Sequence, residues 1–135
     1  MITNFILAPM IAHMVTAILL LFFWRKIALQ RIISVVGNLV AFVLCFRLFF
    51  ATEEFGYLIV QVGSWEAPFG IIFVSDSLSA IMVVLTAIVS LAVGIYSTVA
   101  LNPSRIKYGY FVIFHFLVMG LLGSFLTGDI FNLYV

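Results

Sequence analysis

Two histidines and one aspartate are the residues of this sequence whose types and positions are suited to moving protons or cations. His13 and His115 each lie inside a long apolar run, and Asp129 stands beside the start of another. Histidine titrates near physiological pH, and an ionisable group inside a membrane commonly marks a proton or ion path. The alternatives are a neutral histidine bonded to a neighbouring helix and an aspartate that only caps a helix.

The composition indicates a membrane protein. Of the 135 residues, 66% are hydrophobic and 8% are charged, whereas about 25% of the residues of a soluble domain are charged. The net charge of +1 gives no indication of a nucleic-acid partner. Cys45 is the single cysteine, and the sequence has no phosphate-binding glycine loop, no His-Glu-x-x-His and no Cys-x-x-Cys. We therefore expect neither a cofactor, nor a metal site, nor enzyme chemistry.

The apolar runs predict an all-α polytopic membrane protein that forms a single membrane domain over residues 1–135. A membrane-crossing helix needs about 20 apolar residues, and four stretches meet that need: 5–23, 32–50, 76–100 and 108–126. Ser75 or Asp76 is the expected N-cap of the third. A fifth helix is expected to begin at about residue 129. Because only six residues follow Asp129, we interpret the chain as the N-terminal fragment of a longer membrane protein.

Residues 51–75, between the second and third spans, are too long for a turn. The runs 57–62 and 69–74 are rich in β-formers, with Gly63-Ser64 between them, which predicts a short extracytoplasmic β-hairpin. We expect this hairpin to lie against the outer ends of neighbouring helices or against another subunit.

Charged residues predict the orientation in the cell membrane. Loops 24–31 and 101–107 carry five of the six basic residues, so both loops are expected to be cytoplasmic and the N-terminus outside. Every acidic residue falls on the opposite side, which agrees with this multi-pass arrangement. The lipid bilayer is thus the expected environment of most of the chain.

Small and polar residues recur on one face of three predicted spans. These stripes are Ser34, Asn38, Ala41 and Cys45; Ser79, Thr86, Ser90 and Ser97; and Gly120, Ser124 and Gly128. Such spacing is typical of close helix packing in membranes, and a path for a solute is the less favoured interpretation.

Two segments carry a resemblance to a known family. The first is Gly63-Ser64-Trp65-Glu66-Ala67-Pro68-Phe69-Gly70-Ile71, followed by residues 76–82. The second and stronger one is Gly123-Ser124-Phe125-Leu126-Thr127-Gly128-Asp129-Ile130-Phe131-Asn132-Leu133-Tyr134-Val135. Both resemble the D-type subunit of the Mrp-type multisubunit Na+/H+ antiporter, which is related to the antiporter-like proton-pumping subunits of respiratory complex I.

This resemblance implies a subunit that exchanges Na+ for H+ together with other membrane subunits. The family's central glutamate and lysine, in its fifth and seventh helices, would follow Val135, so neither role is assigned here. Asp129 and Asn132 would lie at the entrance to the fifth helix, with His115 facing it, and these residues and His13 form the candidate proton or ion pathway. The alternatives are a subunit of a complex I or membrane hydrogenase assembly and a small scaffold or assembly protein that transports nothing.

Overall fold

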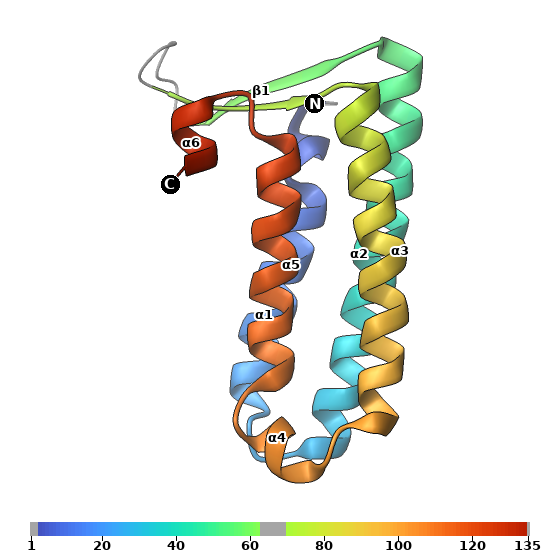
Figure 1. Cartoon of the computed structure of the whole chain (residues 1–135), viewed down its shortest axis with the longest axis vertical. Helices are drawn as coiled ribbons and strands as arrows, with labels where there is room; N and C mark the ends of the chain where they lie inside the picture. Colours follow the sequence, from blue (N-terminus) through green and yellow to red (C-terminus); the bar gives the residue numbers. More distant parts are fainter. Residues whose placement is uncertain (1–2, 63–69, 135) are drawn as a thin grey trace.

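The computed structural model describes residues 3–62 and 70–134, and 79% of the chain is helical. Within these residues, four long helices form an up-and-down bundle (Figure 1). The helical elements are η1 (Thr3–Leu7), α1 (Ala8–Phe22), α2 (Ile27–Phe55), α3 (Ser77–Ala100), α4 (Pro103–Lys107), α5 (Tyr110–Leu126) and α6 (Ile130–Tyr134). The predicted mostly helical fold is confirmed.

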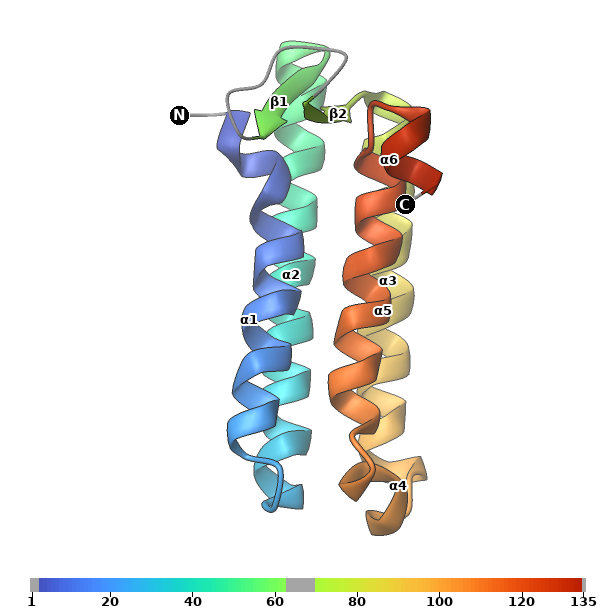
Figure 2. The same cartoon turned by 90° about the vertical axis from the view of Figure 1, so that its left-hand side faces the viewer.

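Three of the helical segments are long and apolar enough to cross a membrane: Phe5–Phe22, α2 and α3. Helix α5 is also apolar but has 17 residues, so a fourth crossing stays a prediction. The long helices pack in a ring in which α1 contacts α2, α2 contacts α3, α3 contacts α5 and α5 contacts α1. Figure 2 shows the same ring from the side, with α1 beside α2 and α5 beside α3.

Helix α2 is longer than the sequence predicted. It has 29 residues and is therefore about 43 Å long, whereas the hydrocarbon core of a bilayer is about 30 Å thick. Arg31 and Glu53, which we assigned to loops, lie in its two ends. Hydropathy marks only the part of a helix that suits lipid, and the good helix formers at both ends continue α2 beyond it.

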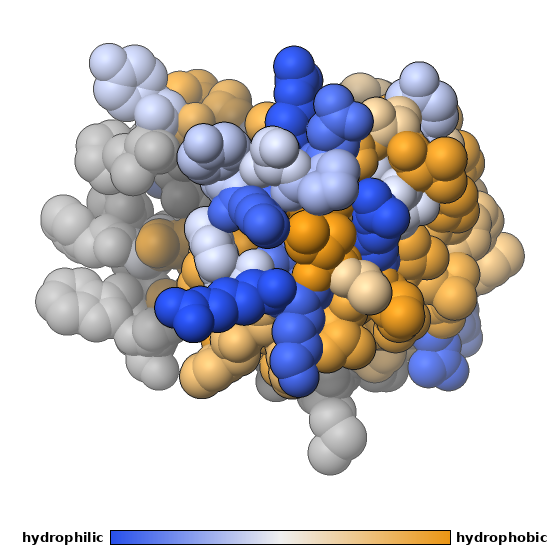
Figure 3. All heavy atoms as spheres, turned by 90° about the horizontal axis from the view of Figure 1, so that it is seen from below, coloured by the Kyte–Doolittle hydropathy of each residue, from blue (hydrophilic) through white to orange (hydrophobic). Residues whose placement is uncertain are grey.

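Basic and acidic residues lie toward opposite ends of the bundle. The α1–α2 connection and α4 carry Arg25, Lys26, Arg105 and Lys107 at one end. Seen from that end in Figure 3, hydrophilic residues extend from the top edge across the middle of the view, and hydrophobic residues cover most of the right side. The acidic residues Glu53, Glu54, Asp76 and Asp129 lie toward the other end, where the sheet is. We call these ends the basic end and the sheet end.

The predicted antiparallel strand pair is confirmed. β1 (Leu58–Val62) pairs with β2 (Ile71–Ser75), with Leu58 opposite Ser75 and Val62 opposite Ile71. The Gly63-Ser64 turn that the sequence indicated lies outside the described residues. The sheet packs on helix ends as expected: the Thr52 and Ser75 hydroxyl groups are 2.8 Å apart, and the Gly128 N–H donates to the Ile72 carbonyl.

Asp76 caps α3, as the sequence predicted. Its carboxylate accepts a hydrogen bond of 2.8 Å from the Ser79 backbone N–H. Hydrogen bonding by the Ser79 side chain and then by its backbone holds the pKa of Asp76 below its usual value. The ionised carboxylate also suits the positive end of the helix dipole.

Replacing Asp76 with alanine is expected to lower the free energy of unfolding by about 1 kcal/mol at neutral pH, because an N–H of α3 loses its acceptor. The folded-state pKa lies below the unfolded one, so the charge-dependent part of this stabilisation is present above the usual aspartate pKa. It is lost as the pH falls through the folded-state pKa. Thermal unfolding of the purified protein at neutral and acidic pH measures this stabilisation. Asp76→Asn is the control, because asparagine can cap the helix without a charge. A difference between wild type and Asp76→Ala that grows on acidification would contradict the assignment.

Candidate functional site

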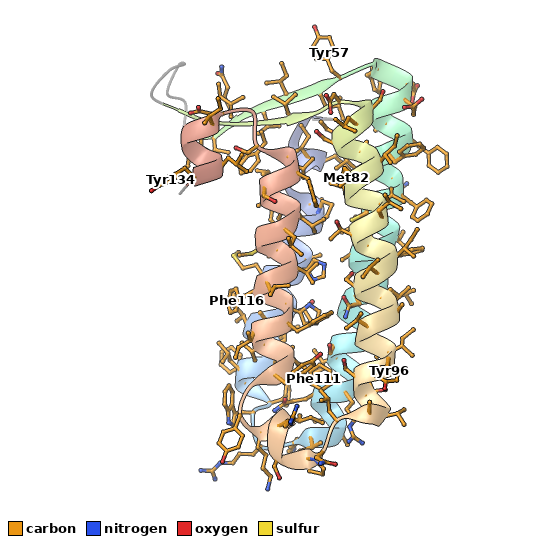
Figure 4. The ribbon with its side chains drawn as sticks, in the orientation of Figure 1. Tyr57, Met82, Tyr96, Phe111, Phe116 and Tyr134 are labelled. Carbon is orange, nitrogen blue, oxygen red and sulfur yellow. The ribbon has the colours of Figure 1, made fainter. Side chains whose placement is uncertain are left out.

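A polar layer divides the apolar core of the bundle. One apolar cluster lies toward the sheet end and includes Leu48, Val83 and Leu122. The other lies toward the basic end and includes Leu20 and Phe111; Figure 4 labels Phe111 there. The polar layer between them consists of His13, Ser34, Asn38 and His115, each at most 1% exposed. Because lipid provides no hydrogen-bond partners, these groups depend on one another.

His13 of α1 and His115 of α5 contact each other directly. Their Nδ1 atoms are 2.8 Å apart and their ring centroids 5.1 Å apart, although 102 positions separate the two residues in the sequence. The packing of α1 against α5 brings the rings together. The two histidines that were predicted separately thus form one buried pair.

Ser34 extends the pair to a third helix. Its Oγ lies 3.0 Å from Nε2 of His115, so the polar contacts run from α1 through α5 to α2. Four residues along α2, the Asn38 amide nitrogen donates to the Ser34 carbonyl, and the Asn38 Oδ1 is buried without a hydrogen-bond partner. The buried stripe that the sequence predicted on this helix is confirmed.

The contacts allow a proton to pass between the rings. In a hydrogen bond between two Nδ1 atoms, one imidazole donates and the other accepts. When His13 donates, Nε2 of neutral His115 carries the hydrogen and donates to Ser34. When His115 donates, its Nε2 accepts from the Ser34 hydroxyl and Nε2 of His13 carries the hydrogen. A proton that arrives at one Nε2 therefore releases another proton at the far end of the pair.

Asp129 lies away from this pair. It stands between α5 and α6 at the sheet end, where it is half-buried. Its carbonyl accepts hydrogen bonds from the Leu133 N–H and the Thr127 hydroxyl. Leu126 follows His115 by eleven positions on α5, which is roughly 17 Å along the helix. Asn132 lies in α6, and its side chain is not among those described.

The predicted packing residues lie in different surroundings. On α3, Ser90 is buried, whereas Ser79 and Thr86 are half-buried. On α5, Gly120 is exposed with open space around it. Ser124 is half-buried and bonds to the Leu121 carbonyl; Gly128 lies against Ile72 and Val74 of β2. Gly120 therefore does not lie in a close helix contact within the described part of the chain.

Two glycines that the sequence analysis did not name lie at close contacts between helices. A Cβ on Gly37 of α2 would overlap the Thr16 side chain of α1. A Cβ on Gly94 of α3 would lie 2.6 Å from the Asn38 amide nitrogen. Gly37 directly precedes Asn38 and is buried with the rest of the α2 stripe. Gly37 could have been identified from the sequence by including glycine among the small residues of that stripe.

Comparisons with known proteins show that the chain is similar in sequence to antiporter subunits. No family model matches it. It is 35% identical over 132 residues to the D-type subunit of the Na(+)/H(+) antiporter of Bacillus subtilis, covering 98% of this chain and 27% of that protein. The resemblance to the D-type subunit of Mrp antiporters is confirmed. The D-type subunit of a probable K(+)/H(+) antiporter of Rhizobium meliloti is 39% identical over 126 residues, covering 90% of this chain and 23% of its own length.

Solved structures share the fold of this chain. The Mrp complex of Dietzia sp. DQ12-45-1b contains a chain with a TM-score of 0.81 and 22% identity, covering 98% of this chain and 24% of that one. The archaeal membrane-bound sulfane sulfur reductase contains another, with a TM-score of 0.80 and 25% identity, covering 98% and 27%. The chain thus spans about a quarter of the length of the antiporter subunits that it matches.

Proposed function

We propose that this chain is part of a subunit of a monovalent cation/proton antiporter, and that the His13–His115 pair moves protons within it. The observation that carries the proposal is the direct contact between two buried histidines in the polar layer of the bundle. Burying an ionisable pair inside a membrane bundle costs free energy. Ionisable residues in such positions commonly belong to proton relays. Similarity to the D-type subunits of Na+/H+ and K+/H+ antiporters supports the same function.

In this proposal, residues 1–135 form one membrane domain that crosses the cell membrane four times. The N-terminus is outside, and the α1–α2 connection and α4 are cytoplasmic. The presence of Arg25, Lys26, Arg105 and Lys107 at one end supports this orientation. The sheet then lies outside the membrane, and other membrane subunits of the complex pack around the bundle.

Asp129 and Asn132 have a separate place in the proposed pathway. Both belong to the connection between α5 and α6 or to α6 itself, at the end opposite the basic residues. We propose that they line the entrance for Na+ or H+ at that end. Transfer between this entrance and the histidine pair would then need further groups, since roughly 17 Å of α5 lies between them.

A subunit of a redox-driven pump is the second candidate function. The fold shared with a chain of a respiratory membrane complex favours it. The two functions differ in their energy source, because an antiporter uses an existing cation or proton gradient and a redox pump needs an electron donor.

Proton exchange in inside-out membrane vesicles tests the proposal. A pH gradient is imposed without an electron donor, and Na+ or K+ is then added to vesicles with the intact complex. We expect the cation to dissipate the gradient, and deletion of this subunit to abolish the effect. Complementation with the wild-type subunit is the control. Proton movement only with an electron donor would favour the pump, and unchanged exchange after deletion would favour a scaffold.

A further inference from the structure

An apolar groove runs between α2 and α3 next to the basic end. It has a volume of about 530 Å³, and its lining includes Arg31, Ile32, Val35, Val36, Thr98 and Val99. Ile32 and Val99 are 59% and 86% exposed, so the groove opens on the outer surface of the bundle. A surface of this kind on a membrane helix pair is suited to a hydrocarbon chain.

Arg31 gives the groove a charged end. One guanidinium nitrogen, Nη2, donates a long hydrogen bond of 3.4 Å to the Leu101 carbonyl, which connects α2 to the residue after α3. The Nε atom is buried and has no hydrogen-bond partner. An arginine donor left without an acceptor is costly. The planar guanidinium binds phosphate oxygens with two parallel hydrogen bonds, so a phosphate in the groove would supply acceptors for Arg31.

The surrounding charge favours an anion. Arg25, Lys26, Arg105 and Lys107 lie at the same end, and no acidic residue in the described part of the chain lies there. Arg31 is only one turn inside the start of α2, at the depth where a lipid headgroup meets the hydrocarbon region. Basic sites between membrane helices bind acidic lipid headgroups for this reason.

We propose that this groove binds one anionic phospholipid. The phosphate contacts Arg31, and one acyl chain lies along Ile32, Val36 and Val99. The other basic residues at this end favour an acidic headgroup over a zwitterionic one. This site is independent of the proposed proton pathway, because His13 and His115 lie inside the bundle and the groove lies outside it.

Native mass spectrometry of the intact, purified protein tests the site. The protein is stripped of lipid and then offered phosphatidylglycerol and phosphatidylcholine together. We expect phosphatidylglycerol to be retained preferentially, and Arg31→Gln to reduce that preference by about fivefold or more. Arg47→Gln is the matched control, because Arg47 lies near the other end of the same helix, away from the groove.

A second variant tests the contribution of the groove to lipid binding separately from that of the Arg31 charge. Val36→Trp fills the groove without removing a charge and should lower the retention of phosphatidylglycerol as Arg31→Gln does. Equal retention of the two lipids by the wild type would overturn the proposal, as would equal losses in Arg31→Gln and Arg47→Gln. Full retention in Val36→Trp would also overturn it, because the lipid would then bind elsewhere.

Discussion

Replacing His13 with asparagine is expected to slow cation-dependent proton exchange by about a hundredfold, while the protein remains folded. The asparagine amide can occupy the position of Nδ1 and keep a hydrogen bond to His115, but it does not titrate. A positioned acid or base commonly contributes about 100- to 10,000-fold to a proton-transfer step. The measurement is the rate of gradient dissipation on adding Na+ or K+ to vesicles with matched amounts of complex.

His115→Gln provides the comparison for this prediction. Glutamine can retain a contact with the Ser34 hydroxyl but has no second ring nitrogen for His13, so exchange should fall as far as in His13→Asn. Cys45→Ala is a control, because Cys45 is buried on α2 within the apolar cluster nearer the sheet. Normal exchange in both histidine variants would mean that the pair only holds α1 and α5 together.

Replacing Gly37 with leucine is expected to lower the free energy of unfolding by about 3 kcal/mol or more. Even a Cβ at this position would overlap Thr16, so α1 and α2 would have to move apart, and overpacking of a tight contact commonly costs about 1–3 kcal/mol. A shift between these helices would also displace His13 from His115. Thermal unfolding of the detergent-purified protein measures the loss.

A double-mutant cycle isolates the contact between Gly37 and Thr16. Gly37→Ala should be milder than Gly37→Leu, and Thr16→Ala should recover part of its loss because two of the three overlapping atoms are gone. The coupling free energy should therefore be favourable and about 1 kcal/mol or more. Additive effects of the two substitutions would show that α1 and α2 do not meet at this pair.

The sequence predicted much of the fold because lipid imposes a simple rule on helices and local chemistry marks their ends. The Asp76 cap depends on residues three positions apart, and the buried stripe of Ser34 and Asn38 on one helical period. By contrast, the pairing of His13 with His115 depends on which helices are neighbours. A single sequence does not show which helices pack together. Helix α2 extends beyond the predicted span at both ends because hydropathy does not measure helix length.

The sequence identified residues of the candidate site but not the contacts between them. Both histidines were identified, but each was expected to act alone or to bond to an unspecified neighbouring helix. Asp129 and Asn132 were grouped with His115, whereas α5 separates Asp129 from it. The Asn38 Oδ1 is buried without a hydrogen-bond partner, and this could not be anticipated, since it depends on how neighbouring helices pack around α2.

Nitrogen NMR of the histidine-labelled protein in lipid bilayers tests the central claim most directly. If His13 and His115 share one proton, a scalar coupling across the hydrogen bond should join their two Nδ1 atoms, and His13→Asn should abolish it. We expect this coupling under the conditions in which the protein exchanges protons. Two Nδ1 signals without mutual coupling, each hydrogen-bonded to a different group, would contradict it.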